Sequence, residues 1–170
     1  MNQNFKQRLK DVQCFIFDVD GVLTNGSLVV MPGELYRVMN IKDGFALKEA
    51  VNAGYKIVII SGGNSDSVRN RLSNLGIENI FLGVENKKKI LDEVIQATKL
   101  NKKNILYMGD DLPDFEVMCN SGVACCPSDA VPEIKEISIY VSPVNGGEGC
   151  VRDVIEQVMR VQGKWPLLKM

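Results

Sequence analysis

The sequence predicts an α/β fold in which a central parallel sheet is flanked by helices, giving three layers. Segments rich in β-forming residues alternate with helical segments along most of the chain, and short glycine-rich links join them. Residues 55–60 form a near-continuous apolar run, as expected for a parallel strand covered on both faces. Because crossovers between parallel strands are right-handed, the carboxyl ends of the strands should meet at one edge of the sheet, where ligands bind.

Composition limits the classes of function. A chain of 170 residues is expected to form one domain, residues 1–170, with a hydrophobic core large enough to be stable without disulfide bonds or structural metal ions. The net charge of −1 and the absence of a long basic run give no reason to expect a nucleic-acid partner. No apolar stretch approaches the length of a membrane span, and the polar N-terminus lacks the apolar middle of a signal peptide.

The five cysteines are odd in number and include no C-x-x-C pair. This pattern favours reduced, mostly buried thiols in a cytoplasmic protein. The chain has no histidine, so a Cys/His metal site is not expected. Any general acid or base near neutral pH must therefore be a carboxylate, Lys, Tyr or Cys.

The first predicted strand, residues 14–17, ends at two aspartates and a glycine. Asp18 and Asp20 lie two positions apart, so in a continuing strand their side chains would point the same way. Two buried anions side by side are costly without a cation, which points to a functional site. The alternative is an aspartate-rich turn, because Asp favours turns in any case.

A hairpin is predicted next, near residues 27–39, with strands at 27–31 and 34–39 around a Pro32-Gly33 turn. The strands alternate poorly, so several apolar side chains would face outward. Such an arm, about residues 25–40, would need a cover, which suggests a subunit contact. A hairpin folded onto its own domain is the alternative, and the pattern leaves both open.

The other elements follow from periodicity, caps and stops. Helices are expected from Asp43-Gly44 to Gly54, and over residues 66–75, 86–100, 112–118 and 150–161. Strands are expected over residues 55–60, 79–82, 104–108, 122–126 and 137–141.

Four strand ends carry the residues that could support chemistry. An acidic cluster with oxygen ligands alone suits a hard cation, of which Mg²⁺ is the default, and Mg²⁺ typically accompanies a phosphate. Ser61 and the amide of Gly62 would cradle that phosphate at a helix N-terminus, and Lys87 would add a fixed positive charge. Each part also has a structural explanation as a cap or a solvated side chain. The acidic cluster comprises Asp18, Asp20, Asp110, Asp111 and Asp114.

In order and spacing these motifs resemble the haloacid dehalogenase-like (HAD) phosphohydrolases over about residues 12–165. The resemblance implies a Rossmann-like fold and an aspartyl-phosphate mechanism. In it Asp18 is the nucleophile, and Asp20 is the general acid and base and offers its backbone carbonyl to Mg²⁺. Ser61 binds the transferring phosphoryl group, and Lys87 holds Asp18 and the phosphate. The remaining roles fall to Asp110, the other carboxylate ligand of Mg²⁺, and to Asp111 and Asp114 in support.

Most relatives carry a cap domain, but here only residues 25–42 separate Thr24 from Asp43, enough for the hairpin alone. A capless chain would need a neighbouring subunit to complete its site, with the hairpin packed against it in a closed ring. The chain is most similar to the capless, tetrameric 3-deoxy-D-manno-octulosonate 8-phosphate (KDO8P) phosphatases, which make a precursor of lipopolysaccharide. The motifs that carry this likeness are Asn40–Gly44, Val68-Arg69-x-Arg71 and Gly146-Gly147-x-Gly149-x-x-Arg152. Residues 125–133 and 163–165 look similar to the Bacteroidetes-type members.

This resemblance implies contacts to a sugar-acid phosphate, whose carboxylate and phosphate suit Lys and Arg. One departure concerns the sugar: many members have Arg directly after the Ser/Thr-Gly pair, where this chain has Gly63 and then Asn64. A nine-carbon substrate such as 2-keto-3-deoxynononate 9-phosphate is therefore an alternative. The implied contacts beyond Asp20, Ser61, Gly62 and Lys87 are Asn40, Ile41, Lys42, Asp43, Gly44, Lys48 and Arg71.

Other functions remain open at this stage. Capless relatives also occur as oligomerising modules without catalysis, and an uncapped monomer could admit nucleotides or proteins. The C-terminal tail, about residues 163–170, holds the one tryptophan of the chain. It could pack on its own domain or fray, or, as in relatives, reach a neighbour's active site.

Overall fold

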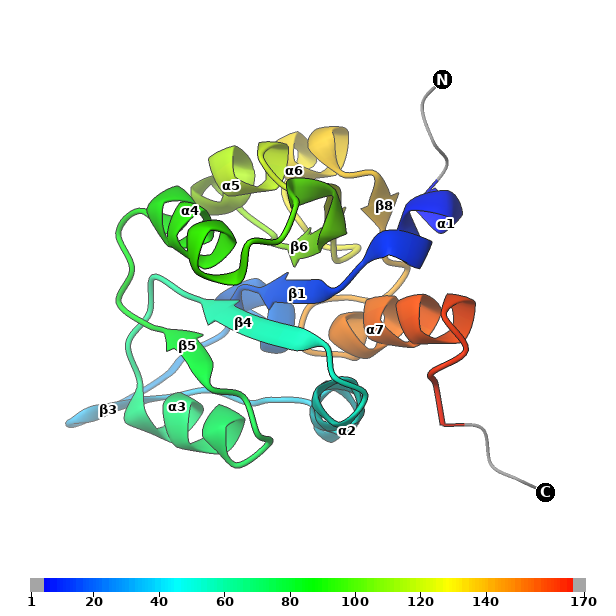
Figure 1. Ribbon diagram of the computed structural model, residues 1–170. Coiled ribbons are helices and arrows are strands. Elements are labelled where there is room, and N and C mark those ends of the chain that lie inside the picture. The colour runs from blue at the N-terminus through cyan, green and yellow to red at the C-terminus, as the bar shows by residue number, and fades with distance from the viewer. Residues whose placement is uncertain (1–4, 167–170) are drawn as a thin grey trace.

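A computed structural model describes residues 5–166 and contains a six-stranded sheet in the order β5-β4-β1-β6-β7-β8. Every neighbouring pair in this sheet is parallel. The predicted α/β fold with a parallel sheet is confirmed (Figure 1). The strands are β1 (Cys14–Phe17), β4 (Lys56–Ile60), β5 (Asn79–Phe81), β6 (Ile105–Met108), β7 (Val123–Cys126) and β8 (Tyr140–Val141).

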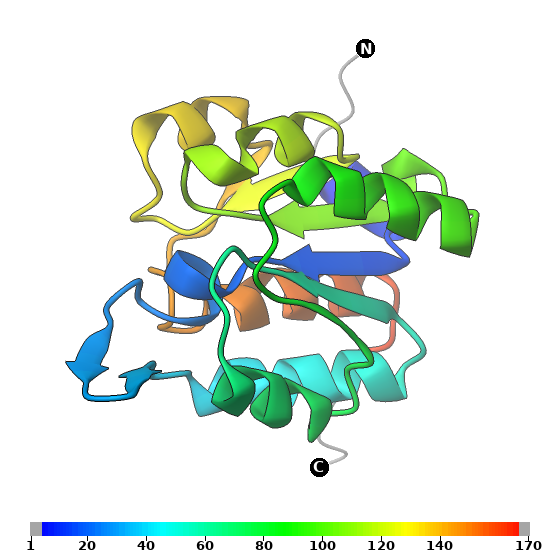
Figure 2. The ribbon, with the colours of Figure 1, turned by 90° about the vertical axis from the view of Figure 1, so that its left-hand side faces the viewer.

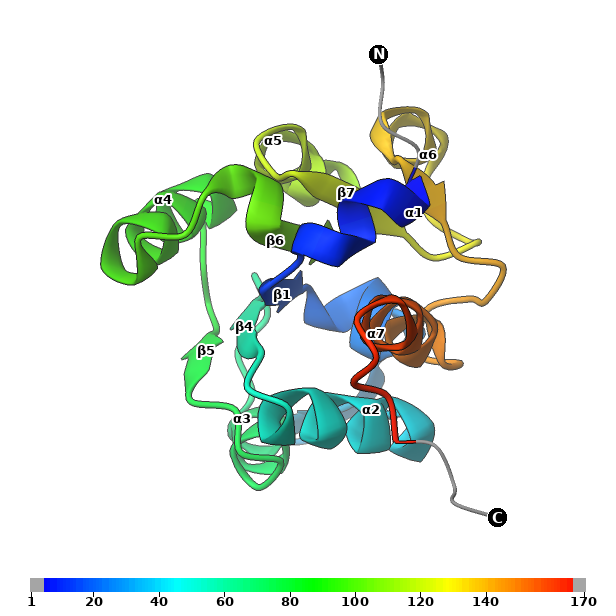
Figure 3. The same ribbon diagram turned by 45° about the vertical axis from the view of Figure 1, so that its right-hand side comes forward.

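Helices cover both faces of the sheet, as Figures 1 and 3 show. One layer holds α2 (Ile41–Asn52), α3 (Asp66–Ser73) and α7 (Cys150–Val161). The other holds α4 (Lys87–Thr98), α5 (Phe115–Cys119) and α6 (Pro132–Ile137). A short α1 (Phe5–Arg8) lies beside β8, where Phe5 stacks on Tyr140.

The strands divide the core into two parts because successive side chains point to opposite faces. In β1, Phe15 and Phe17 join the cluster under α2 and α7. Cys14 and Ile16 join the cluster under α4, α5 and α6. All four side chains of β1 are fully buried, so this strand is fixed from both sides. The residues that follow it therefore start from a rigid base.

The hairpin forms a separate two-stranded sheet, with β2 (Val29–Met31) antiparallel to β3 (Glu34–Tyr36). It projects from the edge of the molecule where the strands of the main sheet end (Figure 2). Val30 is 74% exposed and Val38 is 73% exposed. In the single chain the arm projects with outward-facing apolar side chains, and the predicted subunit contact stays a prediction.

Several predicted boundaries are wrong. The hairpin strands predicted over residues 27–31 and 34–39 are shorter, as given above, and the helix predicted over residues 112–118 is a short turn followed by α5.

Two further errors have a clear local reason. The second helix begins at Ile41, two residues before Asp43, because the Asn40 side chain accepts a hydrogen bond from the Lys42 N–H and caps it there. The strand expected over residues 137–141 is reduced to β8. Ile137, the first residue of the predicted strand, is instead the last residue of α6. This helix begins at Pro132, and proline is favoured at the first position of a helix.

Three expectations from composition can be compared with the described residues. All five cysteines are free thiols, and four are buried, while Cys119 is exposed. No helix within residues 5–166 is long and apolar enough to cross a membrane. Trp165 packs on its own domain, edge-on to Phe45. The rest of the predicted tail, residues 167–170, lies outside the described residues.

Candidate active site

Asp18 is the first residue after β1 and lies at the carboxyl edge of the sheet. Its backbone N–H donates to the Met108 carbonyl of β6, so the chain is still held to the sheet at this point. The carboxylate is nearly buried, at 5% exposure, and one oxygen lies 2.8 Å from the Lys87 ammonium. An anion with so little water around it depends on that cation for its charge balance.

Lys87 is the first residue of α4 and points back into the site. Asn86 caps this helix by accepting the Lys89 N–H, which fixes where the helix starts. The ammonium also lies 2.8 Å from Asp114, so one cation bridges two carboxylates. Burial disfavours the charged ammonium, but Asp18 and Asp114 more than offset this and raise the pKa of Lys87.

Two further carboxylates of the site, Asp110 and Asp114, come from the segment after β6. Asp114 accepts a second hydrogen bond, at 2.6 Å, from the buried Tyr107 hydroxyl. Gly109 has no side chain, and a Cβ there would collide with the Asp114 carboxylate. A Cβ at Gly21, which has φ of +94°, would collide with the Asp110 carboxylate. Both glycines are therefore needed for the carboxylates to approach.

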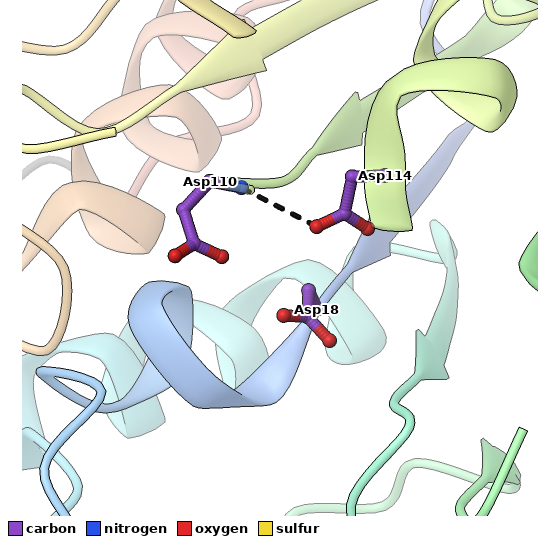
Figure 4. Close-up of side chains that lie close together, drawn as sticks. All are labelled: Asp18, Asp110 and Asp114. Carbon is purple, nitrogen blue, oxygen red and sulfur yellow. Dashed lines mark hydrogen bonds between the residues drawn. The ribbon is translucent and has the colours of Figure 1, made fainter. Parts of the chain in front are cut away.

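Asp18, Asp110 and Asp114 converge so closely that one oxygen of each lies within 4.8 Å of the others (Figure 4). Burial, followed by the repulsion of Asp114, raises the pKa of Asp18 to about 6, against the opposing effect of Lys87. Burial and the neighbouring Asp18 and Asp114 raise the pKa of Asp110 to about 8. Burial is the larger cause of both rises, and the repulsion among three carboxylates that Lys87 alone does not balance adds to it. A hard divalent cation would offset that excess of negative charge. The donor set therefore fits Mg²⁺.

Asp20 lies in an irregular loop, Val19–Leu23, and is less buried than Asp18. Its carboxylate forms a two-point ion pair with Arg37, at 2.6 Å from Nε and 2.9 Å from Nη2. Arg37 follows β3, so it comes from the end of the hairpin. Thr24 adds a long hydrogen bond of 3.5 Å from its hydroxyl. Sequence reasoning placed Asp20 correctly but missed Arg37.

The loop after β4 forms the opposite wall. Ser61 is buried, and its hydroxyl accepts the Gly63 N–H at 3.2 Å. The backbone of Ser61 is held on both sides, by Phe81 and by Val84. Helix α3 begins at Asp66 behind its cap, Ser65. The prediction that Ser61 and Gly62 lie at a helix N-terminus is therefore wrong: a phosphate here would meet loop amides, because Ser65 takes the capping position.

These groups line one cavity of about 520 Å³ at the carboxyl edge of the sheet. The predicted meeting of four strand ends is confirmed in this cavity. Its polar lining residues include Asp18, Asp20, Ser61, Lys87, Asp110, Asp111 and Asp114.

Comparisons with known proteins show which family this chain belongs to. Residues 34–127 match the family model for haloacid dehalogenase-like hydrolases. Over 159 residues the chain is 32% identical to the 3-deoxy-D-manno-octulosonate 8-phosphate phosphatase KdsC of Escherichia coli (strain K12), covering 92% of this chain and 84% of that protein. The chain belongs to the HAD-like hydrolases. Within them it belongs to the KDO8P phosphatase family, which confirms the resemblance seen in its motifs.

Solved structures of this HAD family agree. The KDO8P phosphatase of Moraxella catarrhalis, in complex with magnesium ion, phosphate ion and KDO, has a TM-score of 0.90 at 28% identity and covers 94% of this chain and 92% of that one. The Yersinia pestis enzyme has a TM-score of 0.92 at 28% identity, covering 94% and 87%. The likeness to Bacteroidetes-type members stays a prediction.

The residues that the resemblance assigns to the sugar lie elsewhere in this HAD-like chain. Among the described residues, none of the seven lines the cavity of about 520 Å³. Lys42 and Lys48 are exposed on α2. Arg71 of α3 lies across Gly44 of α2, where a Cβ would come within 2.6 Å of its guanidinium. Ile41 begins α2 and is exposed, and Asn40 caps the helix with its side chain.

Asp43 is turned away from the cavity. It is 1% exposed, and one oxygen accepts the Arg152 N–H at 2.7 Å, in the first turn of α7. The other oxygen has no hydrogen-bond partner within residues 5–166. Burial raises the pKa of Asp43 to about 6, although the hydrogen bond from the Arg152 N–H and the positive charge of the Arg152 side chain both lower it. Substrate contact by Asp43 stays a prediction.

Proposed function

We propose that this chain is a Mg²⁺-dependent phosphatase that hydrolyses 3-deoxy-D-manno-octulosonate 8-phosphate to KDO and phosphate, in the synthesis of the lipopolysaccharide precursor. The observation that carries the proposal is the buried Asp18 carboxylate, which is paired with Lys87 and placed against Asp110 and Asp114. The family membership supports it, since relatives with 30–32% identity are KDO8P phosphatases.

In the first half-reaction, an oxygen of Asp18 attacks the phosphorus atom and the ester P–O bond breaks, leaving an aspartyl-phosphate. A carboxylate approaches a phosphate dianion only if positive charge offsets their repulsion, and Lys87 lies 2.8 Å from the attacking group. Ser61 and the amide of Gly62 lie on the same cavity and would hold the phosphoryl oxygens. The covalent intermediate splits one slow hydrolysis into two easier steps.

Asp20 moves the protons. It gives a proton to the leaving alkoxide in the first step and takes one from the attacking water in the second. Its carboxylate lines the cavity at the mouth, with 32% of its side chain exposed, while Asp18 lies deeper. This difference in depth supports unequal roles for the two aspartates.

Asp18, Asp110 and the backbone carbonyl of Asp20 would hold Mg²⁺. When bound, the ion would neutralise charge on the phosphoryl oxygens. Asp114, tied to Lys87 and Tyr107, would fix the ammonium and support the ligands. Asp111 caps the short turn that begins at Leu112 and so helps to place Asp114.

The sugar is recognised outside this cavity in our proposal. Lys42 and Lys48 lie on α2 and Arg71 lies on α3, and they would bind the carboxylate and hydroxyls of the sugar acid. Gly63 and Asn64 stand where many relatives have Arg, so a nine-carbon sugar-acid phosphate is the second candidate substrate. A non-catalytic module is disfavoured because the groups for catalysis are all present and line one cavity.

We propose further that the enzyme is a homotetramer in the cytoplasm. The exposed apolar arm around β2 and β3 has the character of a subunit contact, and a neighbour's arm would exclude water from the open cavity. Free thiols at all five cysteines suit a reducing compartment.

Phosphate release from a panel of eight- and nine-carbon keto-acid phosphates in Mg²⁺ tests the function. We expect turnover with KDO8P above all others. Asp18→Asn should lower kcat by more than about 10³-fold while Mg²⁺ still binds, because the nucleophile is lost but an oxygen ligand remains.

Asp92→Asn is the matched control, since Asp92 forms an exposed pair with Lys88 on α4 and should keep full activity. If the wild type hydrolyses no member of the panel, the proposed function is refuted. Turnover retained in Asp18→Asn would rule out Asp18 as the nucleophile.

A further inference from the structure

The Tyr107 hydroxyl lies beside the active site and is fully enclosed. Tyr107 is the third residue of β6 and is 0% exposed. Its hydroxyl donates to the Oδ1 atom of Asp114 at 2.6 Å, and Asp114 is itself 1% exposed. Burial and the neighbouring Asp114 carboxylate raise the pKa of Tyr107 well above its ordinary value, so the hydroxyl keeps its proton and stays a donor. A hydrogen bond to a carboxylate is strong in such surroundings.

Lys87 contacts the same oxygen of Asp114. Its Nζ atom lies 2.8 Å from Asp114 Oδ1 and 2.8 Å from Asp18 Oδ1. These contacts form one continuous line from the Tyr107 hydroxyl to Asp18, the proposed nucleophile. None of the four residues in this line is more than 7% exposed, so solvent screens their interactions little.

The direction of the Asp114 carboxylate depends on its donors. Within residues 5–166, its other oxygen, Oδ2, accepts only a long hydrogen bond of 3.4 Å, from the Asp110 N–H (Figure 4). The last torsion of an aspartate is broad, so the backbone alone does not select the orientation of the carboxylate. The short bond from Tyr107 does select it, and it therefore decides where Asp114 Oδ1 lies in front of Lys87.

Lys87 has one more donor than these two carboxylates use. An ammonium carries three N–H donors in fixed relative directions, and two of them face Asp18 and Asp114. The third is left for an oxygen in the cavity, which Lys87 lines together with Ser61 and Gly62. A shift of Asp114 Oδ1 would rotate the ammonium and turn this third donor away from the position of a phosphoryl group.

We propose that Tyr107 is a positioning residue, which acts through Asp114 to direct the Lys87 ammonium at the transferring phosphoryl group. This inference rests on the proposed phosphatase function. In the first step an Asp18 oxygen bonds to phosphorus, the ester P–O bond breaks, and its electron pair stays on the leaving oxygen, which is then protonated. The negative charges of the nucleophile and the phosphoryl oxygens approach each other in this step, so its rate depends on the direction of the Lys87 donor. Tyr107 does not line the cavity and acts only through its neighbours.

Tyr107→Phe removes the hydroxyl and keeps the ring in the core. It should lower kcat/KM for the best substrate of the wild type by about 10–100-fold, because a misplacement of about 1 Å can cost about 10²-fold. Tyr140→Phe is the matched control, since the Tyr140 hydroxyl also donates to a carboxylate, that of Asp153, at 2.8 Å, and lies away from the cavity. It should keep full activity. Urea unfolding should show a loss of stability in both variants, because each leaves a carboxylate short of one donor.

Two inhibitors separate positioning from a structural role. Orthovanadate accepts a fifth oxygen ligand and so resembles the transition state, whereas orthophosphate resembles the product. In Mg²⁺, Tyr107→Phe should weaken inhibition by vanadate by about 10-fold or more, and inhibition by phosphate by less than about threefold. The ratio of the two inhibition constants does not depend on the amount of folded enzyme, so partial unfolding cannot imitate this result.

A double variant tests the path through Asp114. In the Asp114→Asn background, Tyr107→Phe should cost less than about twofold more in kcat/KM, because both changes act on one contact. A loss in the double variant equal to the product of the two single losses would overturn the inference. So would an unchanged kcat/KM in Tyr107→Phe, or an equal weakening of both inhibitors. If the wild type hydrolyses no sugar-acid phosphate, the proposed function itself fails, whereas an active wild type beside an unaffected Tyr107→Phe refutes the inference alone.

Discussion

Asp43 is a buried carboxyl whose two oxygens differ in their surroundings. One accepts the Arg152 N–H of α7, while the other has no partner among the described residues. The carboxyl thus joins α2 to the first turn of α7, where the Gly149 cap has no side chain to accept such a bond. This contact between α2 and α7 lowers the stability of the fold when Asp43 is ionised, because a buried carboxylate with one unpaired oxygen is unfavourable.

The first prediction concerns this cost. Burial raises the pKa of Asp43 to about 6 in the fold, above its ordinary value of 3.8, so between these values the folded state binds more protons than the unfolded chain. The contribution of Asp43 to stability is therefore full below about pH 4 and is lost as the pH rises through 6. Asp43→Asn, which keeps the oxygen for the Arg152 N–H, should gain up to about 3 kcal/mol relative to the wild type between pH 4 and pH 8.

Urea unfolding at several pH values measures this difference. Asp11→Asn, at an exposed aspartate, serves as the control and should show no such gain. A constant difference between Asp43→Asn and the wild type across this range would contradict the raised pKa.

At the scale of elements, the glycine-rich segment before α7 packs against the loop that carries Asp20. The Gly147 N–H donates to the Val22 carbonyl at 2.9 Å, and the Cys150 thiol donates to the same carbonyl. A Cβ on Gly146 would collide with the Gly21 carbonyl oxygen. The loop that carries Asp20 thus lies against backbone from a segment more than a hundred residues away in the chain.

The second prediction follows from this close approach. Gly146→Ala should destabilise the fold by about 3 kcal/mol, because neither backbone can move aside easily. It should also lower kcat/KM, since the Asp20 loop would shift. Gly163→Ala is the matched control: its Cβ would meet nothing within 4 Å, so it should cost only about 1 kcal/mol from its positive φ. Equal losses in the two variants, measured by urea unfolding, would contradict the packing argument.

The sequence was most informative about the sheet and the strand ends. Asp18, Lys87 and Asp110 could be placed together because parallel strands end at one edge, and the turn chemistry of each loop is local. Helix α6 was missed although Pro132 and Glu133 are good first-turn residues, since six residues leave little periodicity to recognise.

The contacts that could not be predicted are those between segments far apart in the chain. Arg37 reaches Asp20 only because of the path that the hairpin takes, and its neighbours in sequence give no sign of that path. Asp43 matched a family motif, but its direction toward α7 depends on how two helices pack. Tyr107 alternates like any strand residue, and its hydroxyl bond to Asp114 follows from tertiary packing.

At the scale of the whole molecule, the projecting arm is the feature that a single chain leaves without a cover. The exposed apolar side chains of β2 and β3 belong to a two-stranded sheet that does not pair with the main one. Such a pair of strands is marginal alone and gains stability from a neighbouring surface. The proposed tetramer would supply that surface.

The third prediction tests the arm. Val30→Glu should convert the tetramer to smaller species, because the change places a charge in the proposed contact while the 74% exposed side chain matters little to the fold of one chain. Val161→Glu, at another exposed valine on α7, should leave the assembly intact. Sedimentation velocity measures both. A wild type that sediments as a monomer would refute the tetramer.

The volume shared by Arg37 and Gly63 has a consequence for exchanging parts between members of the family. The Arg37 guanidinium, at the end of the hairpin, occupies the space that a side chain at position 63 would need. The residues at positions 37 and 63 can therefore be exchanged only together. Grafting an arginine onto position 63, where the resemblance implies one in many relatives, should succeed only if residue 37 is made smaller in the same step. The hairpin and the loop after β4 therefore have to be transplanted together, although positions 37 and 63 lie 26 apart along the chain.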